Sequence, residues 1–201
     1  MPTNDYHFIT EWRLPGTVAE IAEILADAPA LARWWPSVYV SVTHLDPGDE
    51  RGLGRVVDLY TKGWLPYTLR WQFRVTEVQP AGFTLVASGD FVGRGIWRFR
   101  QEGQETVVTY DWKILAEKPI LRRLSFIMKP IFEANHRWAM AQGEKSLKLE
   151  LARRHAASPA ERALVPAPPP PMKVRPELVI VGLLGTAAVL WLLATQPWRD
   201  D

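Results

Sequence analysis

A long helical pattern in the second half of the chain constrains the fold more than any other feature. It runs from Pro119 to Arg154, and Pro130 interrupts it. Proline removes a backbone donor and clashes with the preceding turn, so we expect a break or kink there, with helices over about 120–129 and 130–154. At 100° per residue one stripe is predicted to be buried. Its members are Ile127, Ile131, Ala134, Trp138 and Leu149.

Two polar side chains, Asn135 and Gln142, fall inside this apolar stripe. A buried polar group that lacks a partner costs about 1–3 kcal/mol. Each is therefore expected to find a partner. One possibility is the polar end of an apolar ligand in a cavity. The other is a neighbouring loop, or water at the cavity mouth, and both possibilities stay open.

The residues before the long helix are predicted to form one strand, two helices and six further strands. Thr17 and Glu20 form a capping box that starts a helix running to about Ala26, and a second short helix is expected over 29–35. The strands are predicted over 6–14, 38–45, 52–61, 67–78, 83–88, 95–101 and 106–115. Their alternation leaves one apolar face, which the terminal helix must cover. This order predicts an α+β fold, an antiparallel sheet wrapped on a long helix.

Aromatic residues at alternate strand positions are expected to face that helix. The chain holds ten tryptophans, which either fill the core or line a pocket. The ligand-binding residues predicted on the sheet are Trp71, Phe73, Trp97, Phe99, Tyr110 and Trp112. Those predicted on the helix are Ile131, Asn135, Trp138 and Gln142.

Composition argues against several other functions. The net charge of only +2 speaks against a nucleic-acid binder that relies on a large basic surface. The chain has no cysteine, which excludes disulfides, thiol catalysis and cysteine-ligated zinc. Its four histidines are scattered without metal-ligand spacing, so neither a metal nor another cofactor is expected. No catalytic residue can be assigned from the sequence.

The last part of the chain is predicted to anchor it in a membrane. Residues 156–176 form a proline-rich linker, a composition typical of a semi-rigid spacer. The following segment, 177–198, has no charge between Leu178 and Thr195. At about 1.5 Å per residue those eighteen residues span roughly 27 Å, close to the thickness of a hydrocarbon core. A buried core helix is the alternative.

The orientation of this anchor follows from charge. Lys173 and Arg175 precede the apolar segment, and only residues 199–201 follow it. Basic residues favour the cytoplasmic side, so we expect a single-pass protein whose first 155 residues form a cytoplasmic domain. The N-terminus lacks the apolar region of a signal peptide.

Four stretches carry a likeness to a known group. They are the opening strand with 15–20, the stretch from Asp27 to Pro36, the strand at 95–99, and the helix at 132–138 with Gly143 and Glu144. Over about residues 6–154 the chain resembles the START-like helix-grip superfamily, in particular the polyketide cyclase/dehydrase and lipid transport group (SRPBCC).

The resemblance implies a cavity between helix and sheet that holds a hydrophobic small molecule such as a lipid, a quinone or a polyketide-like compound. It does not imply a reaction. Two alternatives remain: a cyclase or dehydratase on the same fold, and an interaction domain whose cavity is filled by tryptophan. A cavity of several hundred Å³ would exclude the last.

Overall fold

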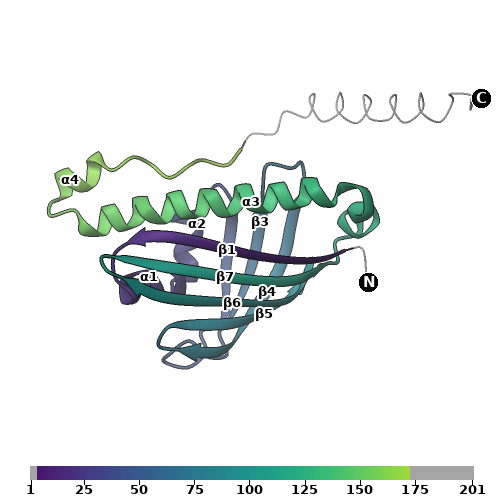
Figure 1. Ribbon diagram of the computed structural model, residues 1–201, viewed down its shortest axis with the longest axis horizontal. Coiled ribbons are helices and arrows are strands. Elements are labelled where there is room, and N and C mark those ends of the chain that lie inside the picture. The colour runs from purple at the N-terminus through teal and green to yellow at the C-terminus, as the bar shows by residue number, and fades with distance from the viewer. Residues whose placement is uncertain (1–3, 173–201) are drawn as a thin grey trace, which may run out of the picture.

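The computed structural model describes residues 4–172, without the side chains at 126 and 127. An antiparallel sheet of seven strands curves around a long helix (Figure 1). The strands are β1 (Asp5–Pro15), β2 (Tyr39–Asp46), β3 (Val56–Lys62), β4 (Thr68–Gln79), β5 (Gly82–Gly89), β6 (Phe91–Glu102) and β7 (Glu105–Ala116). The helices are α1 (Val18–Ala26), α2 (Leu31–Trp34), α3 (Pro119–His155) and α4 (Pro159–Leu164), with a 3₁₀ turn η1 over Ala28–Ala30.

The predicted order of elements and the α+β class are confirmed. The strands lie in the order β1-β7-β6-β5-β4-β3-β2, so consecutive hairpins lead from β2 to β7. The first strand then closes the sheet by pairing with the last, with Phe8 opposite Trp112. The strand β3 begins at Val56 and not at Gly52, because Gly52 and Gly54 take φ values of 84° and 83° in a turn.

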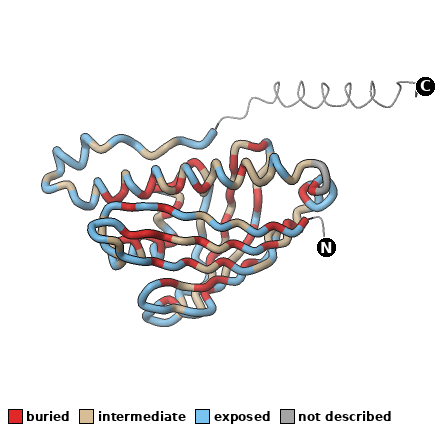
Figure 2. The backbone as a smooth tube through the Cα atoms, in the orientation of Figure 1, coloured by how far each residue is buried: buried red, intermediate tan, exposed pale blue. Residues whose placement is uncertain are grey.

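The core lies between the inner face of the sheet and the face of α3 that packs on it. Buried and exposed residues alternate along the strands, as Figure 2 shows. Large side chains that are almost completely buried fill this space, among them Trp12, Trp34, Leu59 and Leu147. Each hydrophobic side chain of this size contributes about 1.5–3 kcal/mol when it is fully buried.

The long helix α3 is one continuous element, so the prediction of two separate helices is wrong. Pro130 lies inside it, and the ribbon changes direction near its N-terminal end (Figure 1). Pro130 is exposed. Water can therefore reach the backbone where proline removes a hydrogen bond, and the helix continues past it.

The stripe of α3 that was predicted to be buried does not face the sheet. Ile131 is 38% exposed, Ala134, Trp138 and Leu149 are partly exposed, and Ile127 lies outside the described side chains. This stripe lies on a flank of the helix, roughly 120° around its axis from the buried face.

The face of α3 that does meet the sheet contains small and polar residues as well as apolar ones. Its buried members are Leu121, Ser125, Asn135, Met140, Gly143, Ser146, Leu147, Glu150 and Leu151. A Cβ atom at Gly143 would overlap the Trp35 indole, so glycine lets the helix backbone approach this ring closely. Apolar periodicity predicted the wrong face of α3 as buried, because the bulky aromatic rings of the sheet require small partners on the helix.

A bidentate ion pair fixes α2 against the C-terminal half of α3. The Arg33 guanidinium donates to both carboxylate oxygens of buried Glu150 at 2.9 and 2.7 Å. Burial opposes ionisation of Glu150, yet the pair with Arg33 outweighs it and leaves the pKa of this carboxyl below its usual range. At the start of α1, the predicted capping box is present between Thr17 and Glu20.

After α4 the chain returns along the outer side of α3. Arg153 donates to the Pro166 carbonyl, and Lys62 Nζ donates to the Met172 carbonyl at 2.9 Å. Between residues 4 and 172, no helix combines the length and the hydropathy that a bilayer crossing requires. The predicted membrane segment, 177–198, lies outside the described residues.

Candidate functional site

A cavity of about 160 Å³ lies between α3 and the inner face of the sheet. Its walls are mostly aromatic and aliphatic. The sheet contributes residues from several strands, and the helices before β2 close one side. The lining residues on α3 are Leu121, Phe132, Asn135, His136, Ala139 and Met140. The fold thus brings together residues that are far apart in the chain around one apolar space.

The structure gathers six of the ten predicted ligand-binding residues around this cavity. They are Trp71, Phe73, Trp97, Tyr110, Trp112 and Asn135. Phe99 is buried and packs against the wall residue Phe83, but it does not itself line the cavity. Ile131, Trp138 and Gln142 also do not line the cavity. Their part in binding a ligand stays a prediction, as it does for the six.

Stacked rings from neighbouring strands form the sheet side of the cavity. Trp97 and Tyr110 are directly paired across β6 and β7, with ring centroids 4.0 Å apart and planes within 17°. Tyr110 also stacks on Trp112 at 5.5 Å. A Cβ at Gly95 would lie 2.8 Å from the Tyr110 ring, so this glycine leaves room for the stack. The result is a flat aromatic surface suited to a planar apolar group.

Tyrosine hydroxyls are prominent among the polar groups of this apolar space. Tyr6, Tyr39, Tyr67 and Tyr110 all line the cavity, and burial raises the pKa of each phenol. They are therefore neutral hydroxyls at physiological pH, able to donate or accept a hydrogen bond. Tyr110 was predicted from strand alternation. Tyr67 has the same parity as Trp71 and Phe73 in the predicted strand 67–78, so alternation places it on the covered face although it was not among the predicted ligand-binding residues. Tyr39, in the predicted strand 38–45, was missed as well.

His136 is a second cavity residue that sequence reasoning missed. Its ring stacks on Phe8 with centroids 3.9 Å apart, and its Nε2 is buried with no partner among the described residues. Burial, with a smaller effect from Arg137, lowers the pKa of His136 to about 4, so the imidazole is neutral near pH 7. Its spacing in the sequence could have identified it, because His136 lies four residues after Phe132 and four before Met140 and therefore shares a helix face with both.

Asn135 has the loop contact that was one of its two expected roles. Its Oδ1 accepts hydrogen bonds from the backbone N–H of Trp64 at 2.9 Å and of Leu65 at 3.3 Å. A Cβ at Gly63 would overlap this carboxamide, so glycine permits the close approach. Asn135 therefore fixes the β3–β4 loop beside the cavity while its side chain also forms part of the wall.

Replacing this acceptor should release the loop. Asn135→Ala is expected to cost about 1–3 kcal/mol of unfolding free energy, because one buried and one partly buried backbone amide lose their partner. Amide hydrogen exchange should accelerate at Trp64 and Leu65. Asn135→Asp retains an oxygen in the same place and serves as the control, with exchange at both amides close to wild type. Equal acceleration in both variants would show that the oxygen does not fix the loop.

Neither a protein-family model nor a curated protein matches the sequence. Solved structures do match. An aromatase/cyclase from Streptomyces sp. R1128 has 20% identity and a TM-score of 0.56, covering 76% of this chain and 97% of its own. A protein from Thermus thermophilus, TTHA0849, has 16% identity and a TM-score of 0.59, covering 75% and 100%.

A norcoclaurine synthase from Thalictrum flavum is also similar to this chain. It has 14% identity and a TM-score of 0.51, covering 73% of this chain and 96% of its own. A synthase and an aromatase/cyclase thus share one architecture, and identities this low establish the fold and not the activity. The comparisons confirm the predicted helix-grip fold.

Proposed function

We propose that this protein binds a hydrophobic small molecule in the cavity between α3 and the sheet, and that residues 177–198 hold it at a membrane. The observation that carries the proposal is the cavity wall. It combines stacked aromatic rings with neutral hydroxyls and one neutral imidazole. Apolar walls with few polar groups are typical of small-molecule sites.

The size of the cavity limits the size of the ligand that fits without rearrangement. At about 160 Å³ it is smaller than the roughly 300–1,000 Å³ of most ligand sites. It is close to an engineered apolar cavity of about 150 Å³ that binds benzene. It suits a group about the size of one aromatic ring. A larger lipid, quinone or polyketide-like molecule requires wall side chains to move, so the alternative of an interaction domain with a filled cavity needs an experimental test.

The protonation states support binding over catalysis. A general acid or base works best with a pKa near the operating pH. The pKa of His136 is lowered to about 4, and those of the cavity tyrosines are raised. These groups suit hydrogen bonding to a ligand better than proton transfer, which weakens the alternative of a cyclase or dehydratase.

The membrane part of the proposal rests on the sequence. The uncharged run from Leu178 to Thr195 matches the thickness of a hydrocarbon core, and the basic residues before it favour a cytoplasmic domain. Apolar ligands concentrate in bilayers. A tether would therefore keep the cavity near its source of ligand.

A cavity-filling substitution tests the proposal. Ala139 on α3 lines the cavity, whereas Ala141 on the same helix is exposed and does not. Ala139→Phe is expected to weaken binding of p-cresol and toluene at least tenfold, because the new ring occupies the space, whereas Ala141→Phe should leave binding unchanged. Titration calorimetry of the full chain in lipid nanodiscs measures both.

p-Cresol should bind more tightly than toluene if the hydroxyls or the imidazole take part. Native mass spectrometry of the same preparation would identify any ligand that copurifies. Absence of binding to wild type, by both probes and by copurified ligand, would favour the filled-cavity alternative.

A further inference from the structure

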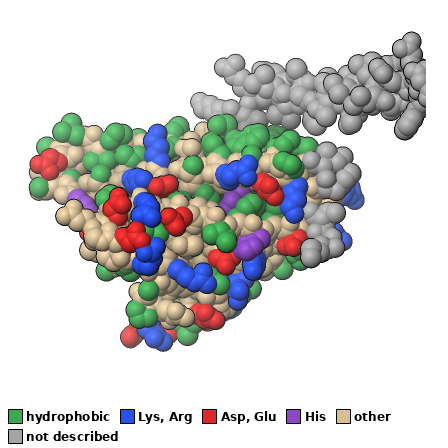
Figure 3. Space-filling model, in the orientation of Figure 1, with side chains coloured by type: hydrophobic (Ala, Val, Ile, Leu, Met, Phe, Trp, Pro, Cys, Tyr) green, Lys and Arg blue, Asp and Glu red, His purple; other side chains and the backbone are tan. Residues whose placement is uncertain are grey.

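One flank of α3 carries apolar side chains that the described part of the chain leaves partly exposed. Ile120, Leu124 and Ile131 are 49%, 40% and 38% exposed, and Trp138 is partly exposed. Their spacings of four, seven and seven residues place them on one line along the helix. We call these four residues the α3 flank. Figure 3 shows hydrophobic side chains along the edge of the molecule above α3, an edge to which the proline-rich segment 165–172 also contributes.

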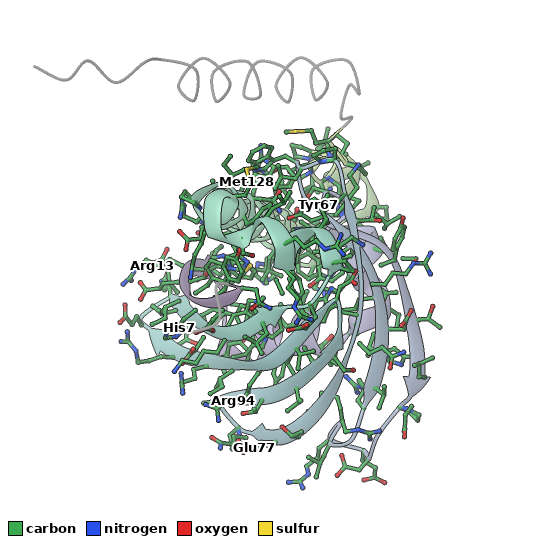
Figure 4. All side chains as sticks on the ribbon, turned by 90° about the vertical axis from the view of Figure 1, so that its right-hand side faces the viewer. His7, Arg13, Tyr67, Glu77, Arg94 and Met128 are labelled. Carbon is green, nitrogen blue, oxygen red and sulfur yellow. The ribbon has the colours of Figure 1, made fainter. Side chains whose placement is uncertain are left out.

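The α3 flank lies beside one side of the cavity. Asn135, roughly 60° around the helix from it, binds the β3–β4 loop, where Pro66 is exposed and Trp64 is partly exposed. After this loop, Tyr67 meets Phe132 of α3 edge to face, with centroids 6.1 Å apart. Both rings line the cavity and both are partly exposed. Because they also lie beside the β3–β4 loop and α3, we infer that the cavity opens between them, and we call this pair the cavity mouth. Figure 4 shows Tyr67 and Met128 of α3 at the same end of the molecule.

The chain leaves the described region next to the same loop. Lys62, which precedes the loop, holds the carbonyl of Met172, and Met172 is itself 42% exposed. Residues 173–177 then separate it from the apolar run that starts at Leu178. Five residues reach at most about 18 Å. A bilayer that held 178–195 would therefore lie close to the cavity mouth.

The charge of this half of α3 suits anionic lipid. Residues 119–138 contain four basic side chains (Arg122, Arg123, Lys129 and Arg137) and one acidic side chain (Glu133), a net +3 with His136 neutral. The whole chain carries only +2. Exposed Ile, Leu and Trp beside Arg and Lys is the composition of helices that lie in a membrane interface.

We propose that the α3 flank rests in the interface of an anionic bilayer, so that the cavity mouth at Tyr67 and Phe132 opens towards lipid. This inference rests on the membrane tether of the proposed function. It adds an orientation to that tether. The domain does not tumble freely at the end of its linker but contacts the membrane with one defined side. The ligand would then pass between bilayer and cavity without crossing water.

The absence of native cysteine allows a direct test. The full chain carrying Ile131→Cys is labelled with bimane and reconstituted into phosphatidylcholine vesicles with and without phosphatidylserine. Val86→Cys is the matched control, since Val86 is 45% exposed, between buried Leu85 and Ala87 of β5, a strand that Figure 1 shows far from α3. Leu124→Cys provides a second site on the flank. Tryptophan fluorescence confirms that each variant is folded.

Two quenchers report the surroundings of the label. Nitroxide-labelled lipid should quench the labels at 131 and 124 at least threefold more than the label at 86, and iodide should quench them at least threefold less. Phosphatidylserine should strengthen the lipid quenching at 131 and 124, and Arg123→Gln with Arg137→Gln should reverse that gain.

Labels at 131 and 124 that iodide reaches as easily as the label at 86 would overturn the proposal. Labels shielded from iodide yet unquenched by lipid would also overturn it, because protein, such as residues 178–195 or a second copy, would then cover the flank. Binding of p-cresol in the same vesicles separates this result from the proposed function. Normal p-cresol binding with a water-exposed flank refutes only the orientation, whereas failed p-cresol binding with a lipid-quenched flank refutes only the cavity.

Discussion

The His136→Phe variant is expected to resist acid better than the wild-type protein. The pKa of His136 in the folded protein is about 4, below the ordinary value of about 6.5. Between these two values the unfolded chain binds a proton that the folded protein excludes. The free energy of unfolding is therefore at its full value above pH 6.5, and protonation of the unfolded state lowers it as the pH falls towards 4.

Between pH 6.5 and pH 4 the wild-type protein should lose about 3 kcal/mol of unfolding free energy through this histidine. The figure follows from about 1.4 kcal/mol for each unit of pKa difference. Phenylalanine does not titrate, can stack on Phe8 as the imidazole does, and gives up no hydrogen bond, since Nε2 has none among the described residues. Urea unfolding from pH 7 to pH 4 should show a much smaller loss in the variant than in wild type.

His44→Gln is the matched control, because His44 is exposed on β2. It should follow the wild-type curve. Identical pH dependence in His136→Phe and wild type would show that the imidazole titrates normally and is not buried as described. Glu150 affects stability in a different pH range. The pKa of its carboxyl is lowered in the folded protein, so its contribution to the free energy of unfolding is lost only below the usual carboxyl pKa of about 4.3.

Gly143→Ala should destabilise the protein although alanine favours helices. Helix propensity alone predicts that the free energy of unfolding rises by about 1 kcal/mol. The new methyl group would overlap the Trp35 indole, which is held by rings of Trp12, Trp34 and Tyr39 with centroids 5.7, 5.6 and 5.1 Å away. Overpacking of this kind costs about 1–3 kcal/mol and occasionally more. The net result should be a loss of up to about 2 kcal/mol in the free energy of unfolding.

The reverse substitution elsewhere on α3 calibrates the measurement. Ala141 is exposed, so Ala141→Gly should show propensity alone, a loss of about 1 kcal/mol. Urea denaturation gives both values. A stabilised Gly143→Ala variant would mean that α3 does not approach Trp35 closely. It would also remove the physical reason for the small residues on the buried face.

Local patterns in the sequence were enough to predict most of the architecture. Strand alternation placed Trp71, Trp97 and Tyr110 on the covered face, because side chains on a strand point to opposite sides in turn. The capping box at Thr17 and Glu20 marked the start of α1, since it depends only on residues three apart. The glycines that shorten β3 show the limit of this reasoning, because their backbone angles become known only in the turn.

The sequence by itself thus determined the order of elements, the apolar face of the sheet and six residues around the cavity. Only the tertiary structure decided which side of α3 faces that sheet. Hydrophobic periodicity favoured the line through Ile131 and Trp138, but the bulk of the sheet's rings demanded the side that carries Gly143 and Ser146. The same rotation brought His136 into the cavity wall and left Ile131 exposed. Shape complementarity between the elements, which no single segment encodes, fixed both the site and the flank.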